Sequence, residues 1–245
     1  MRPRLRTRLL VGVTLGLTLG ALVTLGALGG CSETRAEDSV DVATADLSAF
    51  VTIVDEGAGT TLRVELVGPG AHVHLAPGER FVVHVGASSM TLTPSSAAGE
   101  EDVYLATLPD FSGDLRLDFE RVNDHGVLGL AMPVPPPFTL ALPTTPISRA
   151  APLPLAWSGA GSGYDLALAV DGPCAHLPTR ALSRDDGGYV VQAGELVELP
   201  DAGAPSCTAT VTVTRSLSTS ASFGGPGRFD VDARRTRKGT VESTP

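Results

Sequence analysis

We predict an all-β protein made of two tandem β-sandwich domains, and three observations lead to this prediction. Short segments alternate apolar and polar residues with a period of two, which is typical of strands that bury one face. Gly, Pro, Asn, Asp and Ser cluster between these segments about every ten residues, as turns do. The 245 residues include 28 Gly and 19 Pro, and no amphipathic helical period separates the strand-like segments. A chain of this length has room for one large or two small domains.

The first domain is expected over residues 47–132. Leu62, Val64 and Leu66 alternate with polar residues. The same alternation recurs from residue 115 to residue 119. Turn signals lie between such runs, at residues 57–59, 68–70, 77–78, 112–113 and 123–126. Strand runs separated by turns in this way indicate a β-sandwich.

A proline-rich segment divides the chain. Residues 133–137 include four prolines, which can continue neither a helix nor a strand ladder, so they are expected to form a short, stiff linker. Residues 138–245 then form the second domain, where Leu153, Leu155 and Trp157 alternate with other residues. About seven strands in about 108 residues have the size of an immunoglobulin-like domain, with Trp157 in its core.

The N-terminus resembles a secretory signal. Four arginines fall within the first eight residues, and the next 22 residues carry no charge. A basic region, an apolar region and a small-residue boundary make up a signal peptide. The boundary, Leu28-Gly29-Gly30-Cys31, resembles the bacterial lipobox. That resemblance implies that residues 1–30 are a lipoprotein signal peptide and that Cys31 is acylated. Ser32, which is not Asp, implies passage to the outer membrane in lipoproteins of this kind.

An uncleaved transmembrane anchor is the alternative interpretation, because 22 apolar residues are long enough to span a bilayer. The two interpretations share one topology, with the arginine-rich end in the cytoplasm and the bulk of the chain outside. Residues 31–46 are polar and acidic, so they are expected to be a flexible tether between the membrane and the first domain.

The net charge supports a covalent anchor. The chain has 18 basic and 27 acidic residues and a formal charge of −9; without the four N-terminal arginines, 14 basic residues remain and the charge is −13. So acidic a body has no electrostatic reason to bind nucleic acid, and anionic lipid headgroups would repel it. Acylated Cys31 would therefore be its contact with the lipid bilayer.

The three cysteines fit an exported protein. Cys31 lies at the signal boundary, and Cys174 and Cys207 remain as an even pair in the second domain. Such a pair normally forms a disulfide in an oxidising compartment. We therefore predict one lipidated cysteine and a Cys174–Cys207 bridge, which would contribute about 3–4 kcal/mol by chain-entropy estimates.

Three of the five histidines, His72, His74 and His84, fall within residues 71–85. If the two arms of this segment pair in one sheet, the three side chains share an outward face, and two or three such histidines can ligate zinc or copper. Arg80 would share that face and oppose a cation, no carboxylate is evident nearby, and the arms can equally lie in different sheets. We therefore expect no metal site and no cofactor. The alternative is a metal site formed by these three histidines.

Several short motifs in the second half resemble a group of uncharacterised bacterial lipoproteins with tandem immunoglobulin-like domains. They include Pro-Phe-Thr-Leu (137–140), Leu-Pro-Leu-Ala-Trp-Ser (153–158), Asp-Gly-Pro-Cys (171–174) and the Thr-rich run 207–215. These motifs are strand starts, turns and a cysteine pair. The resemblance therefore implies a fold and a location and transfers no functional residue.

No catalytic motif is found: the chain lacks a nucleophile elbow, a phosphate loop, a dinucleotide loop and a His-Glu-x-x-His zinc motif. We therefore expect a non-enzymatic binding or structural protein of the cell envelope, with an unknown protein or glycan partner. The alternatives are a periplasmic metal-binding protein and a hydrolase that uses carboxylates only. Arg234, Arg235, Arg237 and Lys238 near the C-terminus are expected to guard an edge strand or to contact an anionic polymer.

Overall fold

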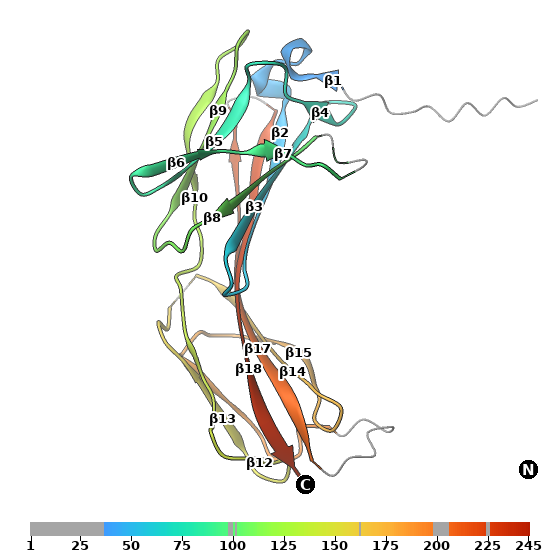
Figure 1. Ribbon diagram of the computed structural model, residues 1–245, viewed down its shortest axis with the longest axis vertical. Coiled ribbons are helices and arrows are strands. Elements are labelled where there is room, and N and C mark those ends of the chain that lie inside the picture. Colours follow the sequence, from blue (N-terminus) through green and yellow to red (C-terminus); the bar gives the residue numbers. More distant parts are fainter. Residues whose placement is uncertain (1–36, 98–99, 101, 162, 198–205, 224–225) are drawn as a thin grey trace, which may run out of the picture. The chain divides into compact units, whose positions relative to one another are not determined.

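The computed structural model describes residues 37–97, 100, 102–161, 163–197, 206–223 and 226–245 (Figure 1). This part of the chain is built from strands and two short 3-10 turns, η1 (Ser39–Asp41) and η2 (Thr44–Asp46). Within it, no helix is long and apolar enough to cross a bilayer. The all-β prediction is confirmed.

The first sandwich is formed by two sheets. One sheet contains β2 (Ser48–Asp55), β3 (Thr60–Val67), β8 (Val103–Leu108) and β7 (Thr93–Pro94), in that order. The facing sheet has the order β10 (Val127–Met132), β9 (Leu115–Glu120), β5 (Arg80–Val85) and β6 (Ser88–Thr91). A two-stranded parallel sheet, β1 (Glu37–Asp38) with β4 (Val73–His74), lies beside them.

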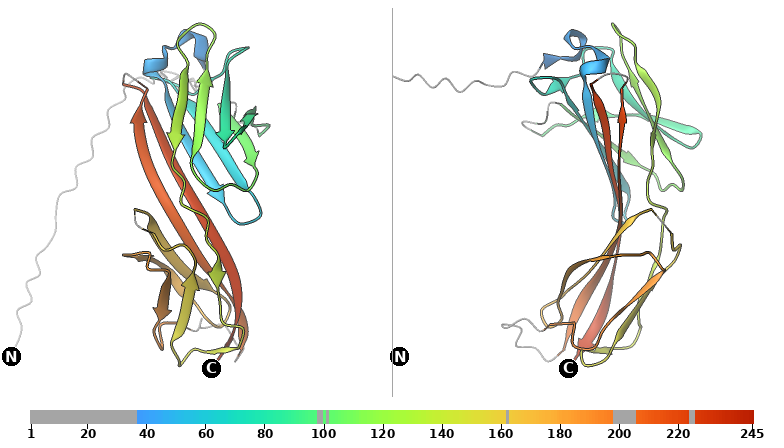
Figure 2. Two further views of the ribbon diagram at one scale, coloured as in Figure 1. Left: turned by 90° about the vertical axis from the view of Figure 1, so that its left-hand side faces the viewer. Right: turned by 180° about the vertical axis from the view of Figure 1, so that it is seen from behind.

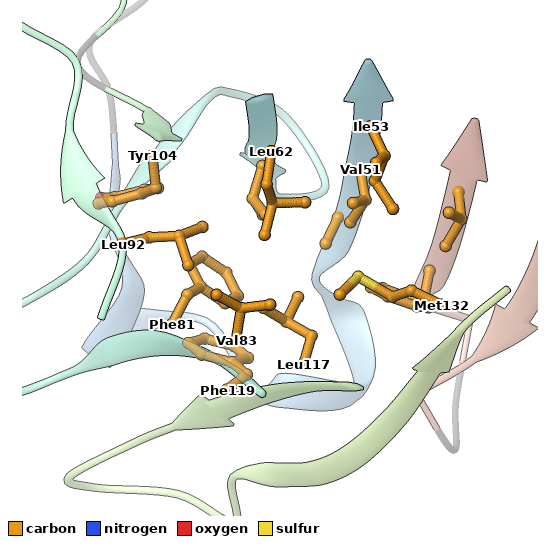
Figure 3. Packing of buried hydrophobic residues seen from close by; sticks show 14 of the residues in the cluster. Val51, Ile53, Leu62, Phe81, Val83, Leu92, Tyr104, Leu117, Phe119 and Met132 are labelled. Atoms are coloured by element: carbon orange, nitrogen blue, oxygen red, sulfur yellow. The ribbon is translucent and has the colours of Figure 1, made fainter. Parts of the chain in front are cut away.

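Alternating side chains of the two facing sheets form the first core. Leu62, Val64 and Leu66 on β3 are fully buried, as the period-two pattern predicts. Phe81 stacks on Phe119 with ring centroids 4.8 Å apart. Figure 3 shows both rings pointing toward the side chains of β2 and β3.

The second sandwich is built in the same way. One sheet is β11 (Leu140–Ala141), β13 (Leu153–Trp157) and β16 (Gly188–Val191); the other contains β15 (Leu177–Leu182), β14 (Asp165–Asp171), β17 (Cys207–Ser222) and β18 (Arg228–Thr244), with β12 (Ile147–Ser148) pairing β18. Trp157 is 5% exposed and belongs to the second core, as predicted.

One hairpin belongs to both sandwiches. β17 and β18 pair without interruption from Cys207↔Ser243 to Ser222↔Arg228, and Figure 2 shows them as the long orange-to-red pair in both views. In the second sandwich β17 pairs with β14 over residues 210–216. In the first sandwich β18 pairs in parallel with β2 over residues 229–235.

The prediction that residues 217–223 and 226–233 belong to the second domain is therefore wrong. Phe229, Val231 and Ala233 are buried in the first core. The physical reason is length: an antiparallel pair of 16 and 17 residues is far longer than the usual strand of about five or six residues. The hairpin therefore extends beyond the second core, and side chains near its turn pack in the first core.

The proline-rich segment lies between the two cores. Residues 133–139 adopt no regular secondary structure. Val134 packs in the first core and Phe138 in the second. In the described part of the chain, this linker, β17 and β18 are three segments that join the sandwiches.

The end of the predicted tether is docked on the first sandwich. Ser39, Val42 and Thr44 are buried. The guanidinium of Arg121, whose side chain is fully buried, donates to the Val42 carbonyl at 2.9 Å, to the Thr44 hydroxyl at 2.7 Å and to the Ser39 carbonyl. The prediction of a flexible tether is therefore wrong for residues 37–46, because a buried cation needs these acceptors. Residues 31–36 lie outside the described residues.

Candidate functional site

Three arginines lie where the hairpin passes from one sandwich to the other. Arg215 on β17 is the direct cross-strand partner of Arg235 on β18, and Arg237 follows two residues later on the same face. Arg215 is 0% and Arg235 3% exposed. We call these three arginines, with Asp55 and Asp185, the joint.

Asp55 neutralises the arginines of β18. Its carboxylate lies at the end of β2 and accepts from Arg235 Nη1 at 2.6 Å. Arg237 approaches it with two nitrogens, at 2.8 and 3.1 Å. The Gly57 N–H also donates to it, at 2.8 Å. This two-pronged geometry is the strong form of an arginine–carboxylate contact.

The same arginines reach across to both sandwiches. Arg235 donates to the Phe111 carbonyl at 3.2 Å, and its guanidinium lies 4.7 Å from the centre of that ring. Arg237 donates to the Phe138 carbonyl at 3.1 Å. Phe111 packs against the first core and Phe138 belongs to the second, so the joint contacts both cores.

Burial and charge act in opposite directions on these groups. Burial by itself would raise the pKa of Asp55, but the hydrogen bonds from Arg237 and Gly57 and the charges of both arginines hold that pKa below its ordinary value of 3.8. Burial lowers the pKa of Arg235, while the charge of Asp55 opposes this shift. Asp55 is therefore ionised at neutral pH.

Arg215 has its own carboxylate in the second sandwich. Its Nε lies 2.7 Å from Asp185 Oδ2, with both side chains buried. Asp185 also accepts from the Trp157 indole N–H at 2.7 Å. Arg215 donates to the carbonyls of Ser158 and Gly159 at 3.1 and 2.6 Å, and it lies 4.5 Å from the centre of the Phe138 ring. The buried guanidinium of Arg215 thus contacts one carboxylate, two loop carbonyls and one aromatic ring.

A hollow of about 500 Å³ opens beside the joint. It is lined by Asp55, Gly57, Asp110, Phe111, Ser112, Pro137, Phe138, Thr139, Ser158, Arg235 and Arg237. Its two arginines are balanced by two carboxylates, so it has no surplus charge for a charged ligand. The arrangement is that of a structural joint.

The edge-strand prediction is wrong at Arg235, which is buried between β17 and β2. One signal in the sequence could have revealed the joint. Phe229, Val231 and Ala233 alternate toward a core, and Arg235 and Arg237 continue the same period before Val241 resumes it. Arginines in the register of core residues indicate buried cations that need carboxylates.

The three predicted histidines are not assembled into one site. His72 precedes β4 and His74 lies on it, whereas His84 lies on β5 in a different sheet. The expectation that no carboxylate is near was also wrong. His72 lies 2.6 Å from Asp102, His74 lies 2.7 Å from Asp38, and His84 lies 2.7 Å from Asp118.

His84 Nε2 and Asp118 Oδ2 form a hydrogen-bonded pair between β5 and β9 on the first sandwich. Burial alone would raise the pKa of Asp118, but the Gly129 N–H, at 2.6 Å, and His84 hold it below its usual value. One carboxylate faces the His84 ring, just as one carboxylate faces the His74 ring.

The Cys174–Cys207 disulfide is confirmed, with Cα atoms 5.7 Å apart. It joins the loop that follows β14 to the first residue of β17. A disulfide is typical of proteins outside the reducing cytosol, in agreement with the cysteine count. Cys31, the predicted lipidation site, lies outside the described residues, as does the signal peptide.

No protein-family profile matches the chain, and no curated protein matches it. Solved structures that are weakly similar to the chain include the following three. An α-2-macroglobulin mutant of Salmonella has 13% identity and a TM-score of 0.26, over 86% of this chain and 16% of that one. The native E. coli α-2-macroglobulin has 14% identity and a TM-score of 0.25, over 82% and 14%. The human OSCAR ligand-binding domain has 14% identity and a TM-score of 0.24, over 80% and 96%.

The chain thus spans less than a fifth of the length of either macroglobulin. Likenesses this weak carry no argument about the role of this protein. The β-sandwich architecture follows from the strand order and the two cores themselves.

Proposed function

We propose that this chain is a non-enzymatic, lipid-anchored lipoprotein outside the cytoplasm, in which two sandwiches held in one fixed relation act as a rigid spacer. Its loops would meet a protein or glycan of the cell envelope. The observation that carries the proposal is the β17–β18 hairpin, which is shared by both cores and ion-paired at the joint.

Rigidity is the property that separates this arrangement from a plain two-domain chain. Domains of one chain usually move relative to each other, because the interfaces between them are small and polar. Here two hydrogen-bonded strands continue from one core to the other. Arg235 and Arg237 also tie β18 to Asp55 at the point of passage. A spacer needs this resistance to bending.

A distance measurement tests the rigidity. Spin labels at Ser88→Cys in β6 and Thr179→Cys in β15 report the separation of the two sandwiches, because both positions are exposed. We expect one narrow distance distribution for the full-length chain in detergent. Broad or multiple distances in the otherwise unaltered chain would refute the spacer.

The anchor is proposed from the lipobox-like boundary, the acidic body of net charge −13 and the disulfide. Ser32 favours the outer membrane as the destination. Growth with a fatty-acid analogue should label the chain and leave Cys31→Ala unlabelled, while Cys174→Ala/Cys207→Ala keeps its label. Equal labelling of wild type and Cys31→Ala would refute lipidation at this residue.

A further inference from the structure

One histidine differs from the other described histidines because two carboxylates converge on it. His72 Nδ1 lies 2.6 Å from Asp102 Oδ2 and 3.9 Å from Glu65 Oε1. One donor atom from each of the three residues lies within 4.8 Å of the other two, and among the described residues this is the only such group of three. We call Glu65, His72 and Asp102 the carboxylate–histidine cluster.

We infer that the carboxylate–histidine cluster binds a divalent transition-metal ion, with Zn²⁺ as the best match. One imidazole nitrogen and two carboxylate oxygens are borderline and hard ligands that Zn²⁺ takes at about 2.0–2.2 Å. Three protein ligands would leave one position for water. Ca²⁺ and Mg²⁺ prefer sites made of oxygen alone, so the imidazole favours zinc over them.

The backbone holds the three residues in place before any ion arrives. Glu65 lies on β3 directly opposite Val103 of β8, and Asp102 immediately precedes that strand. The Leu66 N–H donates to the Asp102 carbonyl at 3.2 Å. His72 is bridged to Val67 at the end of β3. The cost of ordering the ligands is therefore largely met by the sheet itself.

The two oxygens of Glu65 have separate contacts. Oε2 accepts from Arg63 at 2.7 Å, and Oε1 faces the His72 ring. Arg63 thus orients the carboxylate toward the cluster, as outer-shell partners of metal ligands commonly do. Asp102 is only 6% exposed, whereas His72 is exposed to solvent. An ion can therefore reach the cluster from the solvent on the side of His72.

The other histidines provide internal controls. His74, His84 and His125 each face a single carboxylate, from Asp38, Asp118 and Asp124 respectively. If a lone histidine–carboxylate pair were enough, all of these sites would bind alike. The second carboxylate, Glu65, is what the inference depends on.

Binding would also strengthen the place where the N-terminal segment joins the body. The Glu37 N–H donates to the His72 carbonyl at 3.0 Å, and Glu37 pairs with Val73 in the β1–β4 sheet. An ion held by His72 would fix this residue against β3 and β8. Hydrogen exchange at the Glu37 amide should slow when Zn²⁺ is added.

Calorimetric titration of the full-length, tag-free chain in detergent with Zn²⁺ tests the inference. We expect one strong site. His72→Ala and the isosteric Glu65→Gln should each weaken it by at least about tenfold, since even outer-shell changes cost metal sites about 10–100-fold. His84→Ala and His125→Ala should leave it unchanged.

Three outcomes would overturn the inference: no strong site in wild type, equal affinity of His72→Ala and His125→Ala, or an unchanged site in Glu65→Gln. Melting temperatures without metal show whether each variant is folded. If His72→Ala fails to fold, Glu65→Gln decides, because the amide keeps the shape of the side chain and its contact with Arg63 as an acceptor. None of these outcomes depends on lipidation or on the rigidity of the joint.

Discussion

The two sandwiches use the same hairpin in opposite ways. In the second sandwich β17 is the internal strand, with β14 on its far side over residues 210–216, while β18 pairs on its far side only at its end, with β12. In the first sandwich β18 is the internal strand, with β2 on its far side over residues 229–235. The exchange of roles occurs at the Arg215–Arg235 pair, so the buried charges mark the residues where one core ends and the other begins.

Charged side chains, and not additional apolar ones, occupy the position where the hairpin passes from one core to the other. Arg215 reaches the carboxylate of the second sandwich, Asp185, and Arg235 reaches that of the first, Asp55. Apolar side chains could fill either core but would bond to neither loop carbonyls nor carboxylates. Buried ion pairs seldom add much net stability, but removing one partner is costly. The joint therefore penalises any movement that separates a pair.

The largest expected effect comes from Asp55→Asn. The substitution removes the charge that balances Arg235 and Arg237, whereas the corresponding pair in the second sandwich, Arg215–Asp185, keeps both members. We expect a loss of about 3–5 kcal/mol in the free energy of unfolding, measured by urea denaturation. Asp232→Asn, an exposed carboxylate on β18, is the control and should change it by less than about 1 kcal/mol. Equal effects of the two variants would contradict the role of Asp55.

Removal of the disulfide tests the other end of the hairpin. Cys174→Ala/Cys207→Ala should lose about 3–4 kcal/mol. Because the hairpin is common to both cores, the first sandwich should lose stability together with the second. Fluorescence of Trp157, the only tryptophan, reports the second sandwich, and hydrogen exchange on β3 and β9 reports the first. A first sandwich that keeps its full protection would show that the cores are independent.

Lowering the pH should weaken the ion pairs of Asp55 at the joint. The pKa of Asp55 is lower in the folded chain than its ordinary value of 3.8, so the unfolded chain binds the proton more readily. Its contribution to stability is complete above that value and is lost as the pH falls through the folded pKa. Urea midpoints between about pH 6 and pH 2 should therefore fall more for wild type than for Asp55→Asn. Parallel curves would contradict this assignment.

The smallest effect is expected at an exposed ion pair far from the joint. Arg80 and Glu120 lie 2.6 Å apart with solvent-exposed side chains. Arg80→Gln should change the free energy of unfolding by less than about 1 kcal/mol, because water screens such pairs. A loss as large as that of Asp55→Asn would show that burial is not what gives the joint its importance.

The strands could be predicted because each depends on local alternation. Leu62, Val64 and Leu66, or Leu153 and Leu155, point the same way whichever partner strand they meet. The disulfide could also be predicted, because only one pair of cysteines remained once Cys31 was assigned to the signal boundary.

The pairing partners could not be predicted in this way. Nothing local to β18 shows that β2, about 180 residues earlier in the chain, lies parallel to it. From the sequence alone, Arg235 and Arg237 are therefore expected on a solvated edge. For the same reason the cluster of Glu65, His72 and Asp102 could not be seen, since its members come from three separate segments that only the sheet brings together.

Differential scanning calorimetry of the full-length chain tests the shared hairpin most directly. If both cores depend on β17 and β18, the two sandwiches unfold together, in one transition whose calorimetric and van't Hoff enthalpies agree. Two separate transitions in the wild-type chain, each with its own enthalpy, would contradict the account.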